Sequence, residues 1–151
     1  MDVSIRSLEI ANRRLRLNDL APKQRERITL LHGSLMYRDK RLEGYDAATV
    51  TEVIEHLDPP RLAAFERVLF EFARPKAVVL TSPNREYNVV WENLREGKLR
   101  HGDHRFEWTR PEFQGWCNQA AQRFHYQVRF LPVGPEQAGI GSPTQMAIFQ
   151  R

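Results

Sequence analysis

The chain has 151 residues, of which 41% are hydrophobic and 28% charged, as expected for one globular domain that buries a core. Its formal net charge of +4 is compatible with a polyanionic partner but does not identify one. The single cysteine, Cys117, excludes a disulfide framework and a cysteine-rich zinc site, and predicts a reducing, cytoplasmic compartment. No apolar run approaches the roughly 20 residues of a membrane span, so no membrane partner is expected.

The predicted elements alternate between helices and apolar strands. In chain order they are a helix over 4–17, strands over 28–31 and 46–54, a helix from Asp58 to about Phe72, a strand over 76–81, a helix over 109–124, and strands over 126–132 and 144–150. Thr109 and Glu112 form the pattern of a capping box. The alternation predicts one α/β domain over residues 1–151, a mostly parallel sheet with helices on both faces.

Two carboxylates and an imidazole interrupt the apolar sequence TEVIEHL at residues 51–57. Glu52, Glu55 and His56 come where the strand over 46–54 passes into the next helix. Residues spaced i, i+3 and i+4 share a face if this crossing makes one helical turn. Ligands of open α/β sheets bind beyond the carboxyl ends of the strands, so the three side chains are placed to converge on one point.

A second polar motif, HGDH at residues 101–104, follows the strand over 76–81 and is expected at the same edge of the sheet. Two carboxylates plus two imidazoles suit Mg²⁺, Mn²⁺, Fe²⁺ or Zn²⁺. The alternatives are a solvated turn in which Glu55 faces water, and ordinary loop positions for His101 and His104. Spacing alone leaves both interpretations open.

The two motifs together, TEVIEHL and HGDHRFEWTR at 101–110, resemble the small-RNA 3′-terminal 2′-O-methyltransferases, most closely their bacterial RNA-repair branch. YRDKR at 37–41 and TSPNREYN at 81–88 also look like this family. The resemblance implies a class I, Rossmann-like fold that uses S-adenosylmethionine. It also implies catalytic and metal-binding roles for four side chains around one Mg²⁺ or Mn²⁺ ion that holds the 2′- and 3′-hydroxyls of the terminal ribose: Glu52, Glu55, His56 and His104.

The resemblance also assigns contacts with S-adenosylmethionine to Asp2 and Ser4, and to Ser34 and Leu35. A disordered N-terminus and a bare turn are the alternatives. The glycine-rich loop of these enzymes lies upstream of the acidic residue that matches Asp2, and no G-x-G precedes it here. We therefore expect a partial methyltransferase domain that lacks the first strand and glycine-rich loop and carries the metal half of the active site.

The implied substrate is RNA with a free 3′-terminal 2′,3′-diol, and the bacterial relatives suggest an RNA repair kinase–ligase as a further partner. Two other functions compete with methyl transfer: a non-catalytic RNA 3′-end binding fragment, and a metal-dependent hydrolase or oxygenase with the same Glu/His cluster. Basic side chains are candidate phosphate contacts, with solvated surface charges as the alternative. These are Arg38, Lys40, Arg41, Arg95, Lys98, Arg100 and Arg105.

Overall fold

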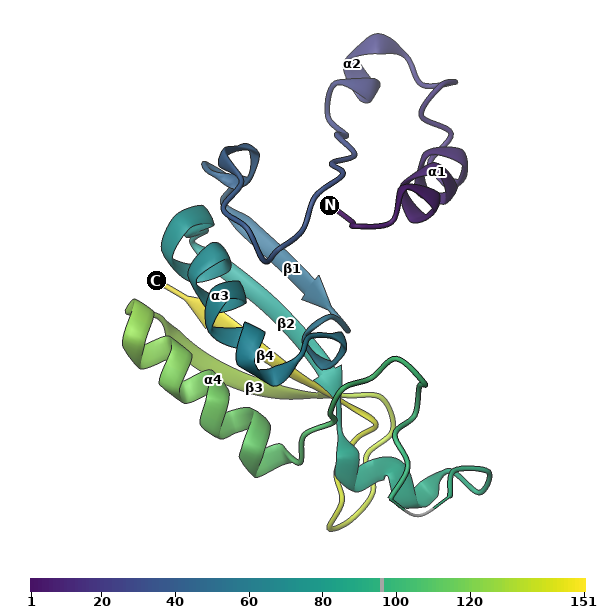
Figure 1. Ribbon diagram of the computed structural model, residues 1–151, viewed down its shortest axis with the longest axis vertical. Helices are drawn as coiled ribbons and strands as arrows, with labels where there is room; N and C mark the ends of the chain where they lie inside the picture. Colours follow the sequence, from purple (N-terminus) through teal and green to yellow (C-terminus); the bar gives the residue numbers. More distant parts are fainter. Residues whose placement is uncertain (96) are drawn as a thin grey trace.

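The computed structural model describes residues 1–95 and 97–151, and its centre is one four-stranded sheet in the order β1-β2-β4-β3 (Figure 1). β1 and β2 are parallel, whereas β4 runs antiparallel to both β2 and β3. The α/β class is confirmed, and this part of the sheet is mixed rather than mostly parallel. The strands are β1 (Ala47–Thr51), β2 (Ala77–Pro83), β3 (Gln127–Val133) and β4 (Thr144–Gln150).

Most of the described helices are short, and α4 is the longest of them. Within the described residues, none combines the length and the apolar character that a membrane crossing requires. The α-helices are α1 (Ile5–Arg14), α2 (Pro22–Arg25), α3 (Leu62–Glu66) and α4 (Arg110–Phe124). The 3-10 helices are η1 (Lys40–Leu42), η2 (Ile54–His56), η3 (Pro59–Arg61) and η5 (Arg85–Val90), and η4 (Arg67–Ala73) is a π-helix.

The hydrophobic core lies between one face of the sheet and the helices α3, η4 and α4. Val78 of β2 pairs with Phe149 of β4, and both side chains are fully buried. They pack in one cluster with Phe65 of α3 and with Phe113 and Cys117 of α4. Figure 1 shows α3 and α4 on the same side of the sheet, while α1 and α2 lie beyond the β1 edge. The expectation of helices on both faces is therefore not met in the described part of the chain.

The strand predicted over 28–31 is wrong. Residues 28–31 carry no strand pairing, and the one isolated parallel bridge nearby pairs Asp2 with His32, just after the segment. In this bridge the backbone N–H of Asp2 donates to the carbonyl oxygen of Leu31 at 3.0 Å, and that of Gly33 donates to the carbonyl oxygen of Asp2 at 3.1 Å. The apolar side chains Ile28 and Leu30 are only half-buried. Their hydrophobic pattern resembles a strand, but the single short pairing with the N-terminal residues supports no sheet among the described residues.

The helix predicted from Asp58 to Phe72 forms as three successive pieces, η3, α3 and η4. Asp58 makes no side-chain cap hydrogen bond, and the two prolines that follow it begin a 3-10 turn. The π-helix ends at Arg74, which has a left-handed φ of 46° and donates its backbone N–H to Leu69 at 3.0 Å. In contrast, the capping box of Thr109 and Glu112 is confirmed at the start of α4.

Candidate metal centre

A sharp turn at Glu52 ends β1 and directs the chain into η2. The strand was predicted to continue to residue 54, but Glu52 has φ of 52°, in the left-handed region that side chains rarely adopt. Its backbone N–H is held by both the carbonyl oxygen and the hydroxyl of Thr81, at 3.3 and 3.2 Å. The two contacts to β2 fix the turn, so the residues of η2 rise from the carboxyl edge of the sheet.

Glu55 is the buried acid of this turn. The apolar side chain of Ile54 anchors η2 in the core, and Glu55 is itself fully buried beside it. Its Oε2 accepts a 3.4 Å hydrogen bond from the Ser82 hydroxyl, while its Oε1 has no partner. Burial raises the pKa of Glu55 to about 7, and the charge of Glu52 adds to this effect, because both disfavour the ionised form.

The loop of the second motif lies against η2. The backbone N–H of Arg105 donates to the carbonyl oxygen of Glu55 at 2.7 Å, which places the neighbouring His104 beside the turn. The rings of His56 and His104 meet edge to face, with centroids 4.8 Å apart. The Nδ1 atom of His104 makes a 2.6 Å hydrogen bond to Oε1 of Glu107. The two polar motifs, almost fifty residues apart in sequence, therefore meet in the fold.

The structure brings three of the four predicted metal ligands together. Glu55, His56 and His104 each offer one ligand atom, and these atoms lie within 4.8 Å of one another. Glu52 is not in this set, but its Oε1 is buried without a partner, as is Oε1 of Glu55. A buried carboxylate oxygen without a hydrogen bond is costly, and a divalent cation would offset that cost. The donor set therefore fits a hard or borderline dication.

A second, more exposed group shares His104 with the first. Ligand atoms of His101, Asp103 and His104 also lie within 4.8 Å of one another. Asp103 contacts Nδ1 of His101 and, through its other oxygen, Nδ1 of His56 at 3.2 Å. The side chains of His101 and Asp103 are 69% and 60% exposed, so this group is more open to solvent than the first, in which Glu55 is buried, His104 half-buried and His56 exposed.

A cavity of about 580 Å³ adjoins the cluster. Three of the four predicted cofactor-binding residues line it, namely Asp2, Ser34 and Leu35, together with Glu52 and His56. Its volume lies in the range of about 300 to 1,000 Å³ that is typical of small-molecule sites. The structure thus places most of the predicted cofactor residues beside two of the predicted metal ligands.

Ser4, the fourth predicted cofactor residue, acts in the local structure. Its hydroxyl caps α1 by accepting the backbone N–H of Ser7 at 3.2 Å, and its own N–H donates to Oδ1 of Asp2 at 2.7 Å. One carboxylate oxygen of Asp2 is therefore engaged by the backbone, and the N-terminal residues are oriented along the cavity wall. A role of Ser4 toward a cofactor stays a prediction.

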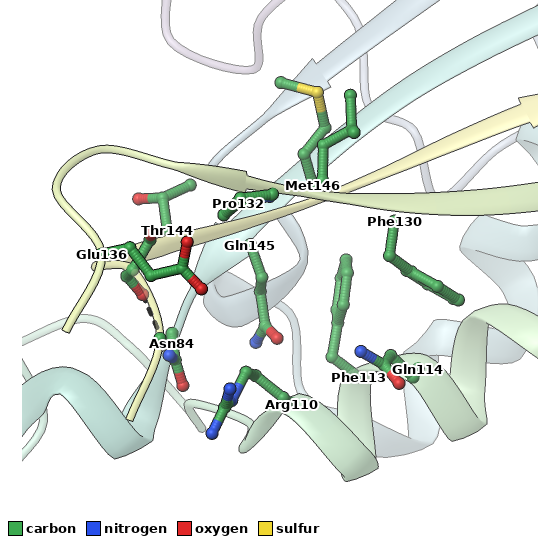
Figure 2. Close-up of a pocket in the computed structure, with 13 residues that line it drawn as sticks. Asn84, Arg110, Phe113, Gln114, Phe130, Pro132, Glu136, Thr144, Gln145 and Met146 are labelled. Carbon is green, nitrogen blue, oxygen red and sulfur yellow. Dashed lines mark hydrogen bonds between the residues drawn. The ribbon is translucent and has the colours of Figure 1, made fainter. Parts of the chain in front are cut away.

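A second cavity, of about 200 Å³, lies between the first turn of α4 and the β3–β4 hairpin (Figure 2). Gln145 extends toward α4 and donates to the backbone oxygens of Pro83 and Trp108 at 3.1 and 3.0 Å. Arg110 forms a 2.7 Å ion pair with Glu86. None of the candidate metal ligands lines this cavity, and its polar side chains join the hairpin loop to α4.

Glu107 was not among the predicted site residues, and Arg100 was predicted only as a candidate phosphate contact. The structure places the guanidinium of Arg100 in a network, where it donates to Oδ1 of Asn88 at 2.6 Å, to the carbonyl of Pro143 at 2.6 Å, and to the carbonyl of Asn84. Glu107 joins the same network through the backbone N–H of Arg100. The only sequence signal for Glu107 is its place in the HGDHRFEWTR motif at residues 101–110.

No protein-family model matches the chain, but individual proteins do. The chain is 43% identical over 127 residues to a small RNA 2′-O-methyltransferase of Rattus norvegicus, aligning 82% of this chain with 32% of that protein. It therefore spans about a third of the length of this curated relative.

Two solved structures align with nearly the whole chain. The methyltransferase domain of bacterial CtHen1-CN superposes with a TM-score of 0.88 at 55% identity, covering 99% of this chain and 75% of that one. The small RNA methyltransferase HEN1 superposes with a TM-score of 0.87 at 32% identity, covering 99% of this chain and 20% of that one. The chain, with its class I methyltransferase fold, belongs to the small RNA 2′-O-methyltransferase family.

Proposed function

We propose that the chain supplies the metal-binding part of an RNA 3′-terminal 2′-O-methyltransferase that uses S-adenosylmethionine. One observation carries the proposal: Glu55, His56 and His104 converge within 4.8 Å, and Glu52 and Glu55 each hold a buried oxygen that has no hydrogen-bond partner. These four side chains would hold one Mg²⁺ or Mn²⁺ ion. A bound dication would lower the pKa of a coordinated ribose hydroxyl and supply charge stabilisation at that oxygen.

The chain's own residues orient and desolvate this centre. Ser82 holds one oxygen of Glu55, and the left-handed turn of Glu52 directs the chain from β1 into η2. The short bond to Glu107 requires the proton of His104 on Nδ1, because a carboxylate only accepts. Only a 3′-terminal ribose offers two adjacent free hydroxyls, so a centre that binds both would select the RNA end.

S-adenosylmethionine is proposed to bind in the cavity beside this centre. Asp2 has one carboxylate oxygen not engaged by Ser4 and would accept hydrogen bonds from ribose hydroxyls of the cofactor. Ser34 and Leu35 line the same cavity and, as the family resemblance implies, would also contact the cofactor. This placement is supported by Glu52 and His56, which line the same cavity. The methyl group of the cofactor would then lie beside the ribose hydroxyl that receives it. Much of the rate would then come from positioning, because the methyl sulfonium is already activated.

The decisive experiment gives an intact enzyme that contains this domain three matched RNA oligonucleotides, which end in a 2′,3′-diol, a 3′-phosphate or a 2′-deoxyribose. We expect methyl transfer from S-adenosylmethionine only to the diol and only with added Mg²⁺ or Mn²⁺. Diol-specific binding without methyl transfer would instead support a non-catalytic 3′-end binding module. Cleavage of the RNA without a methyl donor would support the hydrolase alternative.

An RNA repair kinase–ligase, expected from the resemblance to the bacterial branch, is also proposed as a partner. Its test is co-purification of tagged chain with the kinase–ligase of the same source organism. The control is the same experiment with a surface-matched, unrelated methyltransferase domain. Absence of a complex at micromolar concentrations would contradict this part of the proposal and leave the metal centre unaffected.

A further inference from the structure

Glu107 is the most completely satisfied buried carboxylate near the cluster. Its side chain is 0% exposed. Oε1 accepts hydrogen bonds from Nδ1 of His104 and from the backbone N–H of Arg100, both at 2.6 Å, and Oε2 accepts one from Nδ2 of Asn88 at 2.6 Å. Three donors thus converge on one acid, and one of them is a predicted metal ligand.

This arrangement fixes the protonation of the His104 ring. A carboxylate that receives three donors is an acceptor at all three contacts, so the imidazole proton must lie on Nδ1. Nε2 then carries the free lone pair and is the nitrogen able to bind a cation. A carboxylate behind a metal-binding histidine also makes the imidazole a more basic ligand.

The donors themselves are held in place. Nε of Arg100 donates to Oδ1 of Asn88 at 2.6 Å, so the amide of Asn88 can present only its NH₂ group to Glu107. Nη1 of Arg100 donates to the carbonyl of Pro143 at 2.6 Å, which ties the network to the loop that precedes β4. Glu107 is therefore immobilised from η5, from the HGDH loop and, through Arg100, from the β3–β4 hairpin.

We propose that Glu107 is a positioning residue of the metal centre, which holds His104 as the Nδ1–H tautomer and aligns Nε2 for the cation. The inference rests on the proposed function, because it assumes that His104 binds a metal ion. Asp103 makes a similar contact with Nδ1 of His56, but at 3.2 Å and with a 60% exposed side chain. Glu107 holds its imidazole in a buried, fully bonded setting, where each hydrogen bond is stronger.

The first test measures Mn²⁺ binding to the 151-residue chain by calorimetry, without RNA or S-adenosylmethionine. Glu107→Gln is nearly isosteric, but its NH₂ group must face one of the three donors, so no orientation keeps all three bonds. We expect Mn²⁺ affinity to fall about 10- to 100-fold. The matched control is Glu86→Gln, which alters the ion pair with Arg110, and it should change affinity by less than about twofold.

The second test needs no variant. Long-range ¹H–¹⁵N correlation spectra of the metal-free chain report which ring nitrogen of His104 is protonated. We expect the Nδ1–H tautomer in the unaltered chain and a mixed population in Glu107→Gln. An Nε2–H tautomer in the unaltered chain would overturn the inference, even if the variant did not fold.

The outcomes separate the inference from the function it rests on. If the unaltered chain binds no Mn²⁺, the proposed metal centre itself fails. If the unaltered chain binds Mn²⁺ and Glu107→Gln binds it equally well while remaining folded, the positioning role alone is excluded. Weaker Mn²⁺ binding by folded Glu107→Gln together with a mixed tautomer population of His104 supports the role, because a merely structural residue would leave the Nδ1–H tautomer in place.

Discussion

The backbone N–H of Arg105 donates to the carbonyl oxygen of Glu55 at 2.7 Å. This main-chain hydrogen bond joins the residue that follows the HGDH loop to η2, so it links Glu55 directly to the neighbour of His104. Because it involves no side chain, almost any residue at position 105 preserves it. Proline is the exception, since it has no N–H to donate.

We expect Arg105→Pro to weaken Mn²⁺ binding by about fivefold or more, since a hydrogen bond contributes about 1 kcal/mol net and its loss releases the loop. Arg105→Ala is the matched control: it removes the exposed side chain, keeps the N–H, and should leave Mn²⁺ affinity unchanged. Calorimetric titration of both variants checks this. Equal affinity in the proline variant would show that the loop is held in place by other contacts.

The free energy of unfolding of the metal-free chain should depend on pH through Glu55. Its pKa is about 7 in the folded chain against an ordinary value of 4.5, because burial disfavours its charge. Below pH 4.5 the acid is protonated in both states, and as the pH rises to about 7 the unfolded state ionises first. The stability contribution is therefore lost over this window, by about 3 kcal/mol.

Urea unfolding in EDTA at several pH values tests the effect, with Glu55→Gln as the comparison. The variant carries no titrating group at this position, so its stability relative to wild type should rise as the pH goes from acid to neutral. Parallel pH profiles of the two proteins would show that Glu55 is not a perturbed acid. Mn²⁺ affinity should increase over the same window, because the metal competes with the proton on Glu55.

His104→Ala should reduce Mn²⁺ affinity by about 100-fold or more, because it removes one of the proposed ligands and leaves Glu107 without that donor. The matched control is His125→Asn. His125 ends α4 in a left-handed conformation, with φ of 61°, which asparagine tolerates well. Electron paramagnetic resonance of free Mn²⁺ distinguishes the two variants. Tight binding by His104→Ala would remove this histidine from the centre.

The capping box of α4 should make a measurable contribution to stability. The Thr109 hydroxyl accepts the backbone N–H of Glu112 at 3.4 Å, and the Glu112 carboxylate accepts that of Thr109 at 2.8 Å. We expect Thr109→Ala to lower the free energy of unfolding by about 1 kcal/mol. Thr29→Ala, at an exposed position outside the helices, is the control for loss of a threonine. Equal urea midpoints for the two variants would contradict the assignment.

Cys117 should react only when the core opens. Its side chain is fully buried in α4, and burial raises the pKa of the thiol, so little thiolate forms near neutral pH. Labelling by a disulfide reagent should be slow in the folded chain and immediate in urea. Stoichiometric labelling within seconds under native conditions would show that this face of α4 opens readily.

Local chemistry explains which elements the sequence could predict. The capping box of α4 depends on residues three apart, and β2, β3 and β4 follow from short apolar runs, so these predictions agree with the structure to within one or two residues. The end of β1 could not be predicted in this way. The left-handed turn at Glu52 is set by Thr81 on the neighbouring strand, which no pattern within residues 46–54 reveals.

In the candidate site, too, local sequence predicted some features, while others depend on contacts between distant segments. Spacing placed Glu55 and His56 on one short turn, and the family motif favoured His104 over His101 as the partner histidine. The structure brings His104 into the group with buried Glu55 and His56, while His101 joins only the more exposed group with Asp103. The contact of Glu107 with three donors from separate segments depends on the folded loop, and therefore only the structure could identify it.

The backbone conformation of Glu52 lowers the stability of the fold, whereas its side chain is a proposed metal ligand. A left-handed conformation costs a side-chain-bearing residue about 1 to 2 kcal/mol, which glycine would not incur. Glycine at this position would therefore make the protein more stable but would remove one carboxylate of the proposed metal centre. Selection for heat resistance alone would favour such a substitution, so thermostabilisation of this domain should leave position 52 unchanged.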